Sequence, residues 1–270
     1  MQMINSWLRG AVALVFFVNS IGALADYSDH PNASALIERV AAKGVDRAWL
    51  EAALAEASKQ DSILKAISRP AEKSKPWSEY QDIFLTDRRA KEGLNFWREN
   101  RQALDRVRAE TGVPAEIIVA IIGVETYYGR ITGGYRVIDA LTTLAFDYPR
   151  RSPFFTKELE VFLTLAYESG FPLTEMKGSY AGAMGLSQFI SSSYRAYAID
   201  FDADGKRDLL NSPADAIGSV AAYLKRHGWK TGKSIAIPLK NGTAMPLAPY
   251  KKRKKPTVSV ARLRKAGAPI

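Results

Sequence analysis

One carboxylate stands inside a strongly apolar stretch of the sequence, where it could act as a proton donor. Residues 113–129 read VPAEIIVAIIGVETYYG, with Glu125 in the second half. Pro114 suits the first turn of a helix, because the N–H that proline lacks has no partner there. Apolar residues cover nearly every face of this helix, which predicts that it is buried. Because burial disfavours a charged carboxylate, we expect a raised pKa for Glu125, as a general acid requires.

The apolar helix also permits a simpler interpretation of the same glutamate. Glu125 could lie on the single polar stripe of the helix, or pair with an arginine, and the helix alone does not decide between these roles and catalysis. The two tyrosines beside it, Tyr127 and Tyr128, have the types expected for ordinary packing.

A second motif has the spacing of a cation-binding loop. The run DFDADGKRD at 200–208 matches the start of an EF-hand loop, with candidate ligands at Asp200, Asp202, Asp204 and Lys206. Oxygen ligands at alternate positions, with Gly205 to permit the tight turn, suit Ca²⁺. Position 12 is Asn211 instead of the usual glutamate, so a bidentate ligand must come from elsewhere. The alternative is a solvated acidic turn that binds no metal.

Helical periodicity dominates the elements that would position these groups, so we expect a mainly α protein without internal repeats. Caps support several boundaries: Asp46 and Ser212 before helices, and Gly170 after one. The pattern predicts a mostly irregular segment at 59–78 and a small-residue loop at 179–185. It predicts helices at 34–43, 46–57, 87–111, 113–129, 137–146, 152–169, 186–198 and 212–227.

Charge and cysteine content narrow the setting of the protein. The chain of 270 residues has a net charge of +10, but residues 216–270 hold 13 Lys and Arg and no acid. This basic segment, which includes 251–255, is either a solvated tail or an electrostatic contact for an anionic polymer or membrane. No nucleic-acid-binding motif accompanies it, so we expect no DNA contact. The chain has no cysteine, so no disulfide forms in an oxidising compartment.

The amino-terminal residues 1–25 have the form of a secretory signal peptide. Arg9 precedes a short apolar run, and Ala23-Leu24-Ala25 has the small-x-small pattern of a cleavage site. The run is too short and interrupted for a clear membrane span, although an uncleaved anchor is the alternative. We therefore expect a periplasmic protein without a stable transmembrane segment after cleavage.

Several blocks in order now carry a family resemblance. They are GVETYYGR at 123–130, ALTTLAF at 140–146, YPRR at 148–151, KGSYAGAMG at 177–185, SQF at 187–189 and DAIGSVAAYL at 215–224. Together with WSEY at 77–80, the chain resembles the membrane-bound lytic transglycosylase B family over roughly residues 33–232. The resemblance implies a lysozyme-like transglycosylase domain, mainly α, that carries an EF-hand-like loop.

The resemblance also implies a reaction on peptidoglycan glycan strands. Such enzymes cleave the β-1,4 bond between N-acetylmuramic acid and N-acetylglucosamine without adding water, and leave a 1,6-anhydromuramyl end. By the match, Glu125 is the single acid/base, in contrast to the two carboxylates of ordinary glycosidases. The family implies no cofactor for catalysis and a monomer. A structural Ca²⁺ is the one ion we expect, with Asp215 as its remaining ligand; a capping role is the alternative for Asp215.

Substrate contacts follow position by position from the same match. The expected contacts are Tyr80, Arg150, Arg151, Ser179, Tyr180, Gln188 and Tyr223, and an exposed salt bridge is the alternative for the arginine pair. Small residues at 181–185 are expected to let the backbone approach a sugar. Two positions depart from the family pattern: Ala222 stands where asparagine is usual, and Ser191 where proline is usual.

The expected organisation has four parts: a signal peptide at 1–25, an N-terminal helical region at 26–110, a catalytic core at 111–232 with its acidic loop at 200–215, and a basic C-terminal segment at 233–270. The R-Y-N-type motif that relatives carry after this point is not found in the sequence. Two rival functions therefore stand beside the transglycosylase: a catalytically weak peptidoglycan-binding module, and a hydrolase on the same fold that releases reducing ends.

Overall fold

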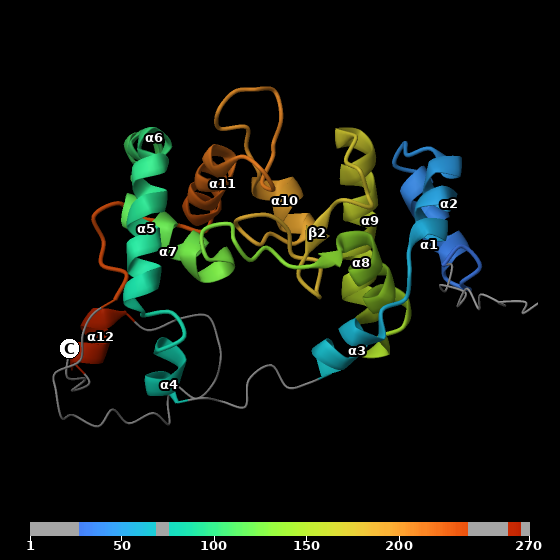
Figure 1. Ribbon diagram of the computed structural model, residues 1–270, viewed down its shortest axis with the longest axis horizontal. Coiled ribbons are helices and arrows are strands. Elements are labelled where there is room, and N and C mark those ends of the chain that lie inside the picture. Colours follow the sequence, from blue (N-terminus) through green and yellow to red (C-terminus); the bar gives the residue numbers. More distant parts are fainter. Residues whose placement is uncertain (1–26, 69–75, 237–258, 266–270) are drawn as a thin grey trace, which may run out of the picture.

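The computed structural model describes residues 27–68, 76–236 and 259–265 (Figure 1). The expected signal peptide and the basic run at 251–255 lie outside the described residues. The helices are α1 (Ala33–Ala41), α2 (Arg47–Glu56), α3 (Asp61–Ser68), α4 (Trp77–Gln81), α5 (Asp87–Glu99), α6 (Arg101–Thr111), α7 (Ala115–Thr126), α8 (Val137–Phe146), η1 (Pro149–Arg151), α9 (Ser152–Ser169), α10 (Ser191–Tyr197), α11 (Pro213–Arg226) and α12 (Val260–Lys265). Strands β1 (Tyr135–Arg136) and β2 (Lys177–Gly178) form a short antiparallel pair.

The helices gather around two hydrophobic cores. Buried residues of α1, α2, α3, α8, α9 and α10 form the first core, and α5, α6, α7 and α11 form the second. In Figure 1 the other helices of the first group lie on the right and the second group on the left, with α10 and β2 between them. The segment between β2 and α10 contributes to both, since Met184 and Phe189 belong to the first core and Leu186 to the second. It therefore connects the two halves.

The helix predicted at 87–111 is in fact two helices. The break falls at Asn100, whose φ of −110° and ψ of 22° leave the helical region. Both the backbone N–H and the side-chain amide of Asn100 donate to the Phe96 carbonyl oxygen, at 3.0 and 2.9 Å, and so satisfy this acceptor at the end of α5. The break lets α5 pack on α7 while α6 packs on α11.

Two other predicted boundaries need correction. The segment 59–78, predicted as mostly irregular, contains α3 and the start of α4. The helix predicted from residue 186 begins only at Ser191, because Gln188 has a left-handed φ of 49° and Leu186 donates its N–H to Leu209. The predicted caps Asp46 and Ser212 are confirmed, since each side chain accepts a backbone N–H of its helix.

Residues 27–68, 76–236 and 259–265 contain no candidate for a membrane-spanning helix. None of the described helices combines the length and the apolar character that a membrane span needs.

Ser191, where the family pattern has proline, is an unfavourable first residue for α10. It is completely buried, and neither its hydroxyl nor its N–H has a partner among the described residues. The preceding Ile190 is extended, with φ −70° and ψ 163°, as a residue before proline must be. We expect Ser191→Pro to raise the free energy of unfolding by about 0.5–1 kcal/mol, measured by urea denaturation.

The next residue supplies the matched control. Ser192 donates its N–H to a carboxylate oxygen of Glu158 at 2.9 Å. Ser192→Pro removes this bond and should lower the free energy of unfolding by about 1–3 kcal/mol. Equal effects of the two substitutions would contradict the assignment of Ser191 as an unpartnered first position.

Candidate active site

Glu125 lies in the last turn of α7, and α7 is less buried than its composition predicts. Ile118, Val119 and Ile122 are buried in the second core, whereas Val124 is 49% exposed and Glu125 itself is exposed. The apolar residues therefore cover more of the helix surface than the core does. The prediction of an all-round buried helix was wrong, and Glu125 faces the open side.

The environment of Glu125 nevertheless favours its protonated form. Removal of water by neighbouring atoms raises the pKa of the Glu125 carboxyl group, and it is the single cause of that shift. Among the described residues, no hydrogen bond or ion pair reaches this carboxylate, so the arginine partner considered above is absent there. A carboxyl group of this kind can hold a proton and still present it to a ligand.

The residue after Glu125 fastens the end of α7 to the connecting segment. Thr126 is buried, and its hydroxyl lies 2.9 Å from the Leu186 carbonyl oxygen, to which it can donate. The Thr126 hydroxyl oxygen also accepts the Gly129 N–H at 3.0 Å. These bonds fix the last turn of α7 against the loop that carries Gln188. Thr126 was missed as a functional candidate, although it lies inside the GVET motif.

The loop from β2 to α10 holds three of the predicted substrate residues. Ser179 accepts the N–H groups of Ala181 and Ala183, at 3.3 and 3.1 Å, and so closes a tight turn. Tyr180 is half-buried against the first core. Gln188 donates its amide to the Thr132 carbonyl oxygen at 3.0 Å, and this contact joins the loop to the segment after α7.

Packing within the protein explains why glycine is needed in this segment, whereas the sequence suggested that small residues let a sugar approach. A Cβ on Gly185 would lie 2.2 Å from the Leu209 carbonyl oxygen, and one on Gly182 would lie 2.6 Å from Leu141. A Cβ on Gly178 would lie 2.3 Å from the Ala183 carbonyl oxygen. The protein's own atoms occupy the space beside each glycine, so no side chain fits there.

Two of the predicted aromatic contacts come from different helices, α11 and α4. Tyr223 of α11 is 36% exposed and packs on Phe189, with 5.8 Å between ring centroids. Tyr80 of α4 is half-buried and lies 5.4 Å from Phe84. The Phe84 ring in turn contacts the Arg89 guanidinium. The guanidinium carbon lies 4.6 Å from the Tyr127 ring centroid. Arg89 has no sequence signal that marks it as part of a site.

The predicted arginine pair belongs to the other half of the molecule. Arg150 and Arg151 are exposed in η1, directly before α9. The guanidinium of Arg151 lies over the Phe154 ring at 4.4 Å. Neither arginine forms an ion pair with any part of the chain that the structure describes, so the alternative of a salt bridge finds no partner there. Both cations remain accessible to an anionic ligand.

The acidic loop brings three of its predicted ligands together. Carboxylate oxygens of Asp200, Asp202 and Asp204 lie within 4.8 Å of one another. Asp200 also accepts the N–H groups of Asp204 and Gly205, at 3.1 and 2.9 Å, so the turn is ordered by its own side chains. Lys206 is exposed and donates its N–H to Asp204 at 2.8 Å, which leaves its carbonyl oxygen available. This donor set suits a hard cation such as Ca²⁺.

Asp215 is not one of these three clustered acids, and it holds the backbone of the loop. It is completely buried, and its two oxygens accept N–H groups from Phe201 at 2.6 Å and Asp208 at 2.8 Å. Burial raises the pKa of Asp215, and the backbone N–H groups oppose that shift. Its own N–H is capped by Ser212 at 3.1 Å. The structure thus shows the capping geometry, and a metal-ligand role for Asp215 stays a prediction.

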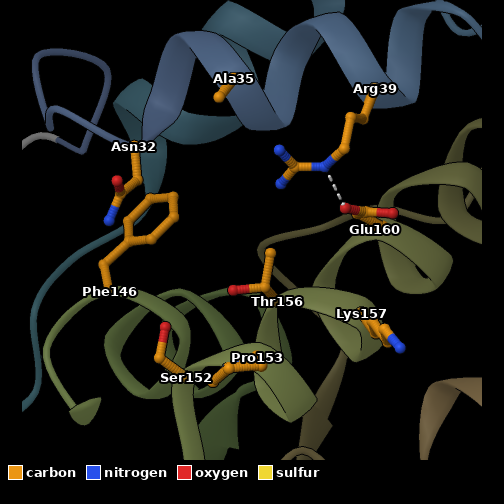
Figure 2. A pocket seen from close by; sticks show the side chains of 9 residues that line it. All are labelled: Asn32, Ala35, Arg39, Phe146, Ser152, Pro153, Thr156, Lys157 and Glu160. Atoms are coloured by element: carbon orange, nitrogen blue, oxygen red, sulfur yellow. Dashed lines mark hydrogen bonds and ion pairs between the residues drawn. The ribbon is translucent and has the colours of Figure 1, made fainter.

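A cavity of about 510 Å³ lies in the first group of helices (Figure 2). It opens between α1 and the first half of α9, and none of the predicted site residues lines it. Figure 2 shows Arg39 reaching Glu160, a contact of 2.6 Å, so part of the charge in this cavity is neutralised internally. Volume alone therefore does not identify the site.

Comparisons with known proteins found similar sequences and structures. The transglycosylase SLT domain family matches residues 28–269. Membrane-bound lytic murein transglycosylase B of Escherichia coli K12 is 44% identical over 229 residues, which cover 81% of this chain and 63% of that protein. The chain thus spans less than two thirds of that relative.

Two solved structures share the fold. The lytic transglycosylase SltB1 of Pseudomonas aeruginosa is 51% identical, with a TM-score of 0.75 over 79% of this chain and 69% of that one. The lytic transglycosylase Slt35 of Escherichia coli, solved in complex with calcium, is 44% identical, with a TM-score of 0.73 over 78% of this chain and 67% of that one. These matches confirm the mostly helical, lysozyme-like fold, and the chain belongs to the membrane-bound lytic transglycosylase B family of SLT-domain proteins.

Proposed function

We propose that this protein is a lytic transglycosylase that cleaves the β-1,4 bond between N-acetylmuramic acid and N-acetylglucosamine in peptidoglycan. The observation that carries the proposal is Glu125, an accessible carboxyl group with a raised pKa and no polar partner among the described residues. Family membership and the 44% identity to a lytic murein transglycosylase support the choice of substrate.

The proposed reaction uses Glu125 twice. The protonated carboxyl group donates its proton to the glycosidic oxygen as the bond to C1 breaks, and the N-acetylglucosamine portion leaves as an alcohol. The substrate's own N-acetyl group stabilises C1 on the muramyl side. The Glu125 carboxylate then removes the proton from the muramyl O6, which bonds to C1 and closes the 1,6-anhydro ring. The carboxyl group ends protonated, ready for another cycle.

The predicted substrate residues would surround this reaction from several elements. Tyr80 of α4 and Tyr223 of α11 offer aromatic rings, and Gln188 bonds to the segment that follows α7. The accessible guanidinium groups of Arg150 and Arg151 suit the carboxylates of lactyl or peptide groups. We propose that Ser179 and Tyr180 shape the loop between these contacts.

The proposed setting is the periplasm, where glycan strands are the partner of a monomeric enzyme. A relative is a membrane-bound murein transglycosylase, which supports an envelope location. The signal peptide would direct export and be cleaved after Ala25. N-terminal sequencing of the exported protein would check this cleavage site.

We also propose that the acidic loop binds a structural Ca²⁺. The clustered carboxylates of Asp200, Asp202 and Asp204 fit the ion, and the related Slt35 was solved in complex with calcium. The Lys206 carbonyl oxygen and Asp215 complete the proposed ligand set. The two positive charges of the ion would offset most of the charge of three neighbouring acids and so stabilise the loop. The catalytic cycle proposed above uses no cofactor.

Glu125→Gln tests the proposed acid/base. We expect the wild-type protein to convert purified peptidoglycan into muropeptides that lack one water and carry 1,6-anhydro ends. Loss of the ionisable group should lower this rate by about 10²–10⁴-fold, measured by mass spectrometry of the products. Glu116→Gln, an exposed position on the same helix, should keep the wild-type rate.

The products also separate the rival functions. Hydrated reducing ends would identify a hydrolase on this fold. Binding to sacculi without any product would support a binding module, and an active Glu125→Gln variant would remove Glu125 from the mechanism.

The raised pKa of Glu125 predicts a pH-dependent stability difference. Because its folded-state pKa is raised, the contribution of Glu125 is fully present below its unfolded pKa and is lost as the pH rises through the folded pKa. Glu125→Gln should therefore melt like the wild type in acid and become relatively more stable as the pH rises through that window. Thermal melting across the pH range measures this, and a constant difference would contradict the raised pKa.

Calcium titration tests the acidic loop. Millimolar Ca²⁺ should raise the melting temperature of the wild type, and Asp202→Asn combined with Asp204→Asn should abolish the rise, because the amides keep acceptors but lose charge. Mg²⁺ should have a smaller effect, since it demands a tighter octahedral site. An unchanged wild-type melting temperature would favour the plain acidic turn.

A further inference from the structure

The chain takes an unfavourable backbone conformation directly after the candidate acid. Tyr127 and Tyr128, the two residues that follow α7, have φ values of 52° and 59°. Residues with a Cβ rarely adopt this left-handed region, and two consecutive bulky residues do so only when the surrounding structure holds them. The turn lies two residues from Glu125, so whatever holds it also affects the last turn of α7.

Helix α5 holds the second tyrosine of this turn. The Tyr128 ring lies against Gly93 of α5 and Gly123 of α7, where a Cβ would come within 2.5 and 2.7 Å of it. Its hydroxyl donates to the Arg89 carbonyl oxygen at 3.1 Å. Both glycines are buried, and the Tyr128 ring fills the space that a larger side chain at either position would occupy.

The side chain of Arg89 holds the first tyrosine and the end of α7. Its guanidinium donates to the Gly123 carbonyl oxygen, and the same oxygen accepts the Tyr127 N–H at 3.2 Å. The guanidinium carbon lies 4.6 Å from the Tyr127 ring centroid, within cation–π range. The negative end of the α7 dipole favours a cation at this position.

We propose that Arg89 is a positioning residue for Glu125. It fixes the Tyr127–Tyr128 turn, and the turn fixes the last turn of α7, so the carboxylate keeps one direction. The inference rests on the proposed function, in which that direction decides whether the proton reaches the glycosidic oxygen. Arg89 does not act as a counter-ion, because it forms no ion pair with a carboxylate in the described residues.

The same guanidinium connects the acid to a predicted sugar contact. Arg89 lies 5.3 Å from the Phe84 ring, and Phe84 lies 5.4 Å from Tyr80. Thr86, the residue before α5, caps the helix by accepting the Arg89 N–H at 3.2 Å. The start of α5 is therefore also bound to Arg89. Arg89 therefore sets the position of α4 and of the start of α5 relative to Glu125.

The test compares three variants in the full chain. Arg89→Met keeps an apolar stem but removes the donors and the charge, Arg89→Lys keeps the charge without the planar stacking group, and Arg88→Met is the control. Arg88 is the exposed neighbour on the same helix. We expect Arg89→Met to lower kcat by about tenfold or more with KM nearly unchanged, and Arg89→Lys to recover part of the loss. Arg88→Met should match the wild type.

Amide hydrogen exchange gives a readout that needs no activity. The Tyr127 and Tyr128 N–H groups, which bond to Gly123 and Ile122, should exchange faster in Arg89→Met than in the control. If Arg89→Met does not fold, the same comparison is made with Arg89→Lys, for which we expect a smaller increase.

The outcomes separate this inference from the proposed function. Unchanged kcat and unchanged exchange in folded Arg89 variants would overturn the positioning role. A raised KM with unchanged kcat would also overturn it, because it would make Arg89 a substrate contact. Faster exchange in a protein whose wild type yields no anhydro product would leave the turn assignment intact and reject the proposed reaction.

Discussion

The arrangement depends on one constraint: a carboxyl group without a polar partner must be held in one direction. An ion pair would fix Glu125 but would also stabilise its charged form and lower its pKa. The structure instead fixes the backbone next to it. Thr126 fastens the end of α7 to Leu186, and the tyrosine turn fastens the same end to α5. The side chain itself is left free of bonds to the described residues, so its proton can be transferred.

This constraint explains why the second core surrounds α7. Helices α5 and α11 both pack on α7, and α6 packs on α7 and α11. Arg106 of α6 also donates to the Phe201 carbonyl oxygen at 2.6 Å, so the acidic loop joins the same body. Gly218 of α11 leaves room for the Phe201 ring, which a Cβ would meet at 2.6 Å. The loop that carries the three clustered aspartates is thus packed into the same core as α7, the helix of Glu125.

Much of the fold follows from periodicity and caps. The helix at 137–146 has the predicted bounds, because buried residues occupy nearly all of it, and the cap at Asp46 is confirmed. The break at Asn100 was not predicted, since asparagine only mildly disfavours a helix. The left-handed Gln188 depends on a tertiary contact, because its amide donates to the Thr132 carbonyl oxygen.

The candidate site was predictable in its residue types and less so in its geometry. The apolar run drew attention to Glu125, but it overstated burial, since helix composition does not tell which face other helices cover. The acidic spacing located the three clustered aspartates. It could not show that Asp215 accepts backbone N–H groups, because those come from residues 7 and 14 positions earlier. Arg89 is distant in sequence from α7 and carries no motif.

The filled space beside the loop glycines has a consequence for mutational tolerance. Gly178, Gly182 and Gly185 are each in contact with the protein's own atoms, so selection would remove substitutions there as strictly as at a reacting group. A survey of tolerated variants would therefore mark this loop together with Glu125, although packing within the protein is enough to explain the glycines. Invariance in this region would report close packing between the two cores as much as it reports chemistry.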